Sequence, residues 1–145
     1  MRIEATEAAS VIVQRRVEWP DTDAAGHYHH STVIRWIESA ESVLHERLGL
    51  LDLFGVVPRV RYEVDYLARL WFRDRVDIEI RVAAVGRTSV TYSFEVRRGG
   101  EVAARGSMVA VSSDPQVGGT MPWLDEVRKA LLESGPQARE LISGA

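Results

Sequence analysis

The chain has 145 residues, and its 18 basic and 21 acidic side chains give a formal charge of −3. This length suits one domain, and 46% hydrophobic residues supply a core, which excludes a mainly disordered chain. Cysteine is absent, which excludes disulfides, thiolate metal sites and a cysteine nucleophile. Because the chain is slightly acidic and has no long apolar run, we expect a cytoplasmic protein that neither binds nucleic acid nor inserts into a membrane.

The first half of the chain predicts a strand, a structured loop and one long helix. Apolar and polar residues alternate over positions 11–19, which is the period of a half-buried strand. Positions 20–26 read PDTDAAG and concentrate residues that favour turns. Apolar residues then recur every three or four positions over 31–48, with a serine or threonine as the expected N-cap and Gly49 as the C-cap.

The second half predicts a meander of strands and a short helix. Strand patterns with period two occupy residues 60–66, 76–82, 90–96 and 102–111. Short connections that contain glycine join the last three, as is typical of antiparallel hairpins. Residues 122–133 predict a short amphipathic helix. This order predicts an α+β fold in which an antiparallel sheet covers one helix, and its uncovered edges favour oligomers.

Asp21 and Asp23 stand in the loop that leads into the long helix. Aspartates in such a loop often only close backbone turns. A helix start, however, offers unpaired N–H groups and the positive end of the helix dipole, which can hold a carbonyl oxygen as it gains negative charge. A nearby carboxylate can attack that carbonyl or activate a water. Asp23, Gly26 and His30 lie within one short stretch, which favours acyl transfer from an activated ester.

Other chemistries find less support in the sequence. His27, His29 and His30 invite a metal site, but their spacing lacks a carboxylate-and-histidine motif on a helix, so we expect no metal. Serine-hydrolase, Rossmann and P-loop motifs are absent. The polar side of the long helix is expected to meet water, a cavity or a partner, and it carries Arg35, Glu38, Glu41 or Ser42, and His45.

The stretch VEWPDTDAAGHYHHS at residues 17–31, followed by RWIE at 35–38, resembles the signature of the 4-hydroxybenzoyl-CoA thioesterase family of hotdog-fold proteins. The segments YEVDYL, FRDRV and GRTS, which begin at residues 62, 72 and 86, continue the resemblance. The chain departs from the family pattern in having His27 and Tyr28 after the glycine, which predicts a more polar pocket entrance.

The resemblance implies a five-stranded antiparallel sheet wrapped around one long central helix, within a hotdog domain at residues 1–114. Residues 115–145 would form a tail with a short helix in the same domain. A homodimer or homotetramer would join its sheets, with active sites at the interface. The resemblance implies that Asp23 is the catalytic nucleophile or general base, and that the backbone N–H of His30 polarises the thioester carbonyl. It also implies substrate-binding roles for Gly26, Glu38, Arg87 and Ser89.

We therefore expect hydrolysis of an acyl-CoA, or of an acyl group on a carrier protein, to a free acid and a thiol without a cofactor. One alternative is a hotdog module that binds acyl-CoA without cleaving it, and thiol release would separate the two. Another is a hotdog hydratase, although the Asp-x-Asn-Pro-x-His sequence is absent. Glu38 can equally be a solvated helix residue, and Arg87 an ordinary exposed arginine or a ligand of CoA phosphates.

Overall fold

The structure, a computed structural model, describes residues 7–53 and 57–142. The outermost parts of the predicted domain and tail, residues 1–6 and 143–145, lie outside the described residues. The elements in chain order are β1 (Ser10–Arg16), a 3-10 turn η1 (Trp19–Asp21), α1 (His30–Leu48), a second 3-10 turn η2 (Leu51–Leu53), β2 (Arg59–Tyr66), β3 (Arg75–Val85), β4 (Ser89–Arg98), β5 (Glu101–Val111) and α2 (Asp125–Glu133).

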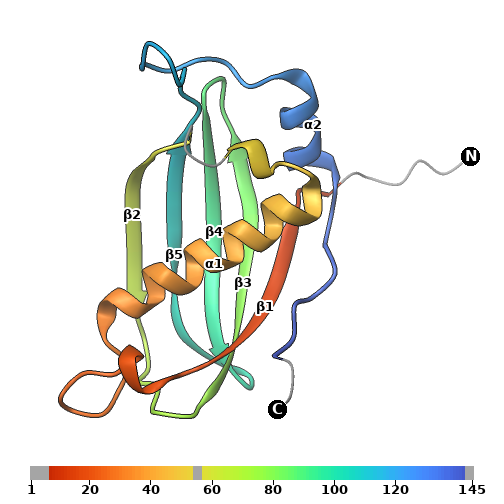
Figure 1. Ribbon diagram of the computed structural model, residues 1–145. Coiled ribbons are helices and arrows are strands. Elements are labelled where there is room, and N and C mark those ends of the chain that lie inside the picture. Colours follow the sequence, from red (N-terminus) through yellow and green to blue (C-terminus); the bar gives the residue numbers. More distant parts are fainter. Residues whose placement is uncertain (1–6, 54–56, 143–145) are drawn as a thin grey trace, which may run out of the picture.

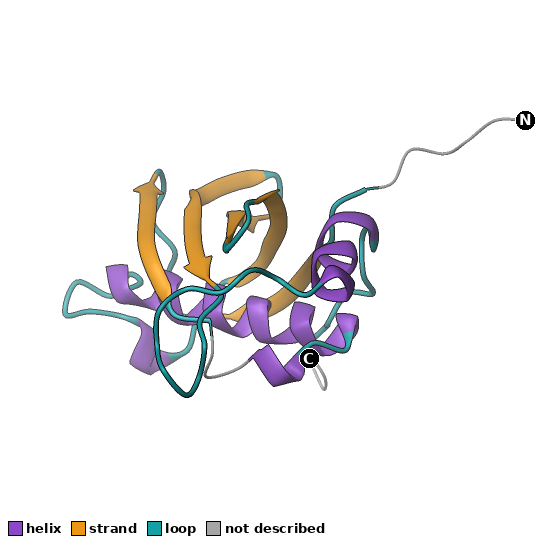
Figure 2. Cartoon of the chain, turned by 90° about the horizontal axis from the view of Figure 1, so that it is seen from above, coloured by secondary structure: helices purple, strands orange, loops and turns teal. Residues whose placement is uncertain are grey.

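The five strands form one antiparallel sheet in the order β1-β3-β4-β5-β2, and the sheet curls around α1 (Figures 1 and 2). The periodicity of α1 explains this packing, because its apolar stripe is fully buried against the sheet through Val33, Ile37, Ala40 and Leu44. The predicted architecture, with a long helix and a short C-terminal helix, is confirmed.

The two edges of the sheet differ. Along β1, the segment 136–140 runs beside the strand with parallel bridges between Ser10 and Pro136 and between Val13 and Glu140. Backbone bonds of 2.8 Å from Gln14 N–H to the Glu140 carbonyl and from Gln137 N–H to the Ser10 carbonyl hold it there. At the other edge, β2 pairs only with β5 among the described strands. The C-terminal segment therefore covers one edge and leaves the other open.

The predicted first strand extends too far. β1 ends at Arg16, and Trp19, which was expected on its buried side, begins a 3-10 turn and is 68% exposed. Pro20 explains the break, because it has no N–H to give to a strand ladder and suits the first turn of a helix. The chain therefore leaves the extended strand conformation where the loop before α1 begins.

The polar side of α1 is only partly exposed, which corrects the expectation that it all meets water, a cavity or a partner. Glu41 and His45 are buried at 3% and 2% exposure. Arg59 at the start of β2 forms an ion pair with Glu41, and His45 Nε2 lies 2.9 Å from the Tyr92 hydroxyl. Burial raises the pKa of Glu41 to about 6 and lowers the pKa of His45 to about 4.

Candidate active site

A cavity of about 380 Å³ lies where α1 begins and β2 ends. Both of these element ends are at the lower left of Figure 1. Segments far apart in sequence line it: the loop before α1, the first residue of α1, the last residue of β2 and the connection that follows. The lining residues are Asp23, His27, Tyr28, His30, Tyr66, Leu67, Ala68 and Arg69. The fold therefore brings Asp23 and His30, which the sequence singled out, to one cavity.

The two carboxylate oxygens of Asp23 have different surroundings. Oδ1 accepts a hydrogen bond of 2.8 Å from the backbone N–H of Ala25 and so closes a turn. Oδ2 accepts no hydrogen bond from the described residues and lies 3.8 Å from Nδ1 of His27. The side chain is 31% exposed. Asp23 thus combines both readings of the sequence, because one oxygen orients the side chain and the other is available at the cavity.

Gly26 makes this loop possible. Its φ of +91° lies where side chains are rarely tolerated, and its N–H donates to the Asp23 carbonyl at 3.0 Å. A Cβ at this position would stand 3.7 Å from the ring of Trp71. Gly26 therefore shapes the turn that carries Asp23, although it does not line the cavity itself.

Asp21 fixes the loop to α1. Its Oδ2 accepts from the Glu18 N–H at 2.8 Å, and its Oδ1 pairs with Arg35 at 3.1 Å. Its carbonyl accepts from the backbone N–H of His29 at 2.7 Å and from the hydroxyl of Thr32 at 2.9 Å. These bonds explain why the loop arrives at the helix start in one orientation.

The N-cap of α1 is His29, which corrects the expectation of Ser31 or Thr32. Its extended backbone ends the loop, and its Nδ1 accepts from the Ser31 N–H at 3.2 Å. The backbone N–H of His30, the first helical residue, has no acceptor among the described residues. At a helix start, such an N–H is available to a ligand oxygen and is reinforced by the helix dipole.

Two tyrosines complete the cavity, and of the two the sequence pointed only to Tyr28, at the pocket entrance. Tyr66 donates from its hydroxyl to the His30 carbonyl at 2.7 Å. Tyr28 is buried, donates to the Ala68 carbonyl at 3.0 Å and stacks on Trp36, so it packs into the structure as well as lining the cavity. Burial raises the pKa of both phenols. Tyr66 comes from 36 positions beyond His30, so no local signal could have found it.

Three predicted substrate-binding residues lie away from this cavity in the same chain. Glu38 is exposed two helical turns beyond His30. Arg87 and Ser89 lie at the β3–β4 connection, which is at the top of Figure 1, whereas the start of α1 and the end of β2, which line the cavity, are at the bottom. The eleven residues of β3 separate these ends by roughly 30 Å. A single chain therefore does not bring Arg87 to Asp23.

Two histidines of the loop, which the sequence raised as candidate metal ligands, make structural contacts. His27 packs edge-on against Trp71 with ring centroids 5.8 Å apart, and His29 caps α1. Within residues 7–53 and 57–142, no group of three or more histidine and carboxylate side chains is arranged to hold a metal ion. Among the same residues, no helix is long and apolar enough to cross a membrane.

Comparison with known proteins adds the family. A 1,4-dihydroxy-2-naphthoyl-CoA hydrolase of Prochlorococcus marinus (strain NATL2A) is 26% identical over 116 residues, covering 71% of this chain and 75% of the relative. A structure described as a predicted thioesterase from Bacillus stearothermophilus has a TM-score of 0.78 at 26% identity, covering 84% of this chain and 93% of that one. A 1,4-dihydroxy-2-naphthoyl-CoA thioesterase from Synechocystis shares the fold, with a TM-score of 0.77 at 17% identity, covering 84% and 95%. The family model of the thioesterase-like superfamily matches residues 17–131, and this chain belongs to that superfamily.

Proposed function

We propose that this protein hydrolyses an acyl thioester of CoA, or of a carrier protein, to a free acid and a thiol, as a member of the 4-hydroxybenzoyl-CoA thioesterase family within the superfamily. One observation carries the proposal. Asp23 and His30 line the same cavity, and the His30 N–H has no acceptor among the described residues, so a carbonyl group bound between the two residues would meet a base or nucleophile and an oxyanion donor together. The names of the hydrolase and thioesterase relatives agree with this chemistry.

The reaction can follow either of two balanced routes. In the first, Oδ2 of Asp23 attacks the carbonyl carbon, the C–S bond breaks and the thiolate departs. The acyl group remains on Asp23 as a mixed anhydride, which water then hydrolyses. In the second, Asp23 accepts a proton from a water as the water oxygen attacks that carbon, and it gives this proton to the sulfur as the C–S bond of the tetrahedral intermediate breaks and the thiol leaves. In both routes the negative charge on the carbonyl oxygen faces the His30 N–H and the positive end of α1.

A second copy of the chain completes the proposed site. The β1 edge is covered by residues 136–140, so the open β2 edge is the surface left for sheet-to-sheet pairing. Antiparallel pairing of two β2 strands turns the β3–β4 connection of one copy toward the catalytic end of the other. Such a homodimer gives the exposed Arg87 a route to CoA phosphates that a single chain does not offer.

The test is thiol release from a panel of short, long and aryl acyl-CoA substrates by the wild type and by Asp23→Asn. We expect Asp23→Asn to fold normally and to lose nearly all turnover. Asp125→Asn, a matched change at an exposed carboxylate of α2, away from the β2 edge, should retain it. Wild-type turnover by Asp23→Asn would disprove the assignment of Asp23. Binding of acyl-CoA by the wild type without thiol release would instead identify a binding module.

A further inference from the structure

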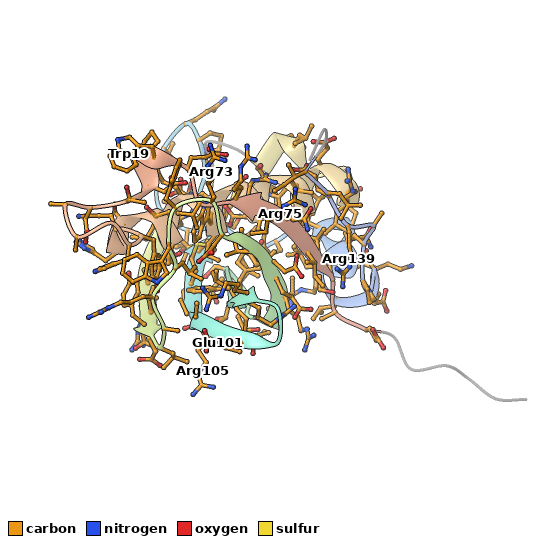
Figure 3. The ribbon with its side chains drawn as sticks, turned by 90° about the horizontal axis from the view of Figure 1, so that it is seen from below. Trp19, Arg73, Arg75, Glu101, Arg105 and Arg139 are labelled. Atoms are coloured by element: carbon orange, nitrogen blue, oxygen red, sulfur yellow. The ribbon has the colours of Figure 1, made fainter. Side chains whose placement is uncertain are left out.

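A cluster of exposed aromatic and basic side chains stands beside the cavity. Trp19, Trp71 and Phe72 are 68%, 43% and 41% exposed, and Trp19 packs edge-on against Phe72 with ring centroids 5.6 Å apart. Arg73 and Arg75 follow directly in the chain, and both are exposed. We call these five residues the rim patch. Figure 3 shows Trp19, Arg73 and Arg75 in succession along one side of the molecule, with Arg139 of the tail farther along the same side and Arg105 apart from them.

The rim patch is held rigidly. Arg73 has a φ of +77°, and it is the only residue other than glycine with a positive φ in the part of the chain that the structure describes. Its N–H donates to the Val17 carbonyl at 2.8 Å, and Asp74 closes the turn by accepting from the Trp71 N–H at 2.8 Å. A strained backbone of this kind persists only where its surroundings enforce it, and it occurs preferentially at functional sites. The turn presents its aromatic rings and its guanidinium to solvent instead of the core.

The rim patch is continuous with the cavity. Trp71 forms a bridge with His27 and covers Gly26, so it touches the loop that carries Asp23. The Tyr28 N–H donates to the Leu70 carbonyl at 2.8 Å, which joins the same two segments. Arg69, four residues before Arg73, lines the cavity itself. Whatever occupies the rim patch therefore stands at the entrance to the proposed site.

The charge of the rim patch is uncompensated. Among the described residues, no carboxylate pairs with the guanidinium groups of Arg69, Arg73 or Arg75, and that of Arg73 lies over the Phe72 ring at 5.4 Å. Other arginines are paired, as Arg97 is with Glu79 and Glu95, although Arg87, Arg105, Arg128 and Arg139 also have no ion pair among the described residues. A chain with a net charge of −3 thus keeps unpaired positive charge at one end. Such a region attracts an acidic partner.

We propose that the rim patch is a docking surface for an acidic carrier protein, which presents its thioester to the cavity; this rests on the proposed hydrolysis of thioesters. Trp19, Phe72 and Arg73 stand outside the cavity, and the Phe72 ring is already covered by Trp19 and Arg73, so they offer no slot for a nucleotide base. Exposed tryptophan with arginine is instead the composition of protein interface hot spots. The partly polar cavity lining favours a protein over a lipid surface as the neighbour.

The experiment compares two substrates that carry the same acyl group. This group is chosen as the one whose CoA thioester the wild type cleaves fastest. One is that acyl-CoA, and the other is the acyl group loaded on a bacterial acyl carrier protein. Two rim variants are tested. The first combines Trp19→Ser with Arg73→Asn, because asparagine tolerates the positive φ of position 73. The second is Arg75→Glu. Arg139→Glu is the matched control, because Arg139 is also exposed and lies in the tail.

We expect kcat/KM with the loaded carrier to fall about 10-fold or more in the rim variants, mainly through KM, and kcat/KM with acyl-CoA to stay within about twofold. Arg139→Glu should match the wild type on both substrates. Added salt should weaken turnover of the loaded carrier more than that of acyl-CoA. Calorimetric titration with the carrier that bears unacylated phosphopantetheine should show the same loss in the rim variants, without any hydrolysis.

Four results would overturn the docking proposal. The first is an equal loss of kcat/KM on both substrates in the rim variants, and the second is no loss of kcat/KM on the loaded carrier. The third is binding to phosphatidylglycerol vesicles by the wild type but not by the rim variants, with turnover of the loaded carrier unchanged. The fourth is a change of oligomeric state in the rim variants. The last two identify a lipid surface or a second copy as the occupant. If the wild type binds the carrier through the rim patch but cleaves no thioester, the proposed function fails and the docking proposal stands.

Discussion

The role of the first amide of α1 can be tested by His30→Pro, which removes the backbone N–H of this residue together with its imidazole. Proline is favoured at the first position of a helix, where the N–H has no partner within the helix. The preceding residue, His29, already has φ −73° and ψ 144°, the conformation that a residue before proline prefers. Because the His30 N–H has no acceptor among the described residues, its removal costs no protein hydrogen bond.

The expected effect is therefore on the reaction and not on folding. Loss of one oxyanion donor typically costs about 100- to 1000-fold in kcat, or about 3 to 4 kcal/mol of transition-state stabilisation. His30→Ala is the matched control, because it removes the imidazole and keeps the N–H. The two variants are compared by steady-state thiol release on the best acyl-CoA, with thermal unfolding to verify that both fold.

A kcat for His30→Pro within about threefold of that for His30→Ala would refute the reasoning, provided that both variants unfold at the wild-type temperature. The carbonyl oxygen would then be stabilised elsewhere. Equal and large losses in both variants would assign the role to the imidazole. Only a loss confined to proline supports the amide.

Three further predictions concern the loop, the buried pair and the tail. Gly26→Ala forces an alanine to φ +91° beside Trp71, so the free energy of unfolding in urea should fall by about 1 to 2 kcal/mol and turnover should decrease. An unchanged urea midpoint would contradict the prediction that alanine is strained at this position. Burial holds the pKa of His45 near 4 instead of 6.5, so about 3 kcal/mol of stability, present above pH 6.5, should disappear as the pH falls toward 4. Burial raises the pKa of Glu41 from 4.5 to about 6, so protonation of Glu41 between pH 6 and 4.5 should offset about 2 kcal/mol of this loss in the free energy of unfolding. On acidification, His45→Gln should lose less stability than the wild type in urea unfolding. Equal losses in the two proteins would exclude His45 as the cause. Ending the chain at Gly135 should expose the β1 edge and produce concentration-dependent association by light scattering, and a variant that stays in the wild-type state would show that the edge needs no cover.

The loop before α1 illustrates how far the sequence reaches. The pattern PDTDAAG predicts turns, and both aspartates do accept backbone hydrogen bonds within them. The N-cap prediction was wrong because the choice among several candidate caps depends on where the loop is anchored. Asp21 provides that anchor by accepting the His29 N–H, a contact that local propensity does not encode.

The polar side of α1 shows a second limit. Helical spacing correctly grouped Glu38, Glu41 and His45, but it gave no means of telling exposed from buried members. Burial of Glu41 depends on Arg59, which lies 18 positions away on β2. A charged residue becomes tolerable in a core only when a partner arrives from elsewhere in the fold.

By itself, the sequence determined the order of the strands and the two α-helices, the α+β architecture and the turns of the loop that carries Asp23, because these depend on periodicity and turn chemistry between near neighbours. Only the tertiary structure decided that Tyr66 and Arg69 join Asp23 and His30 at one cavity, and that Arg87 lies at the far end of the sheet. It also decided which sheet edge the tail covers. These features depend on contacts between distant segments, whose geometry is set by the curvature and pairing of the whole sheet.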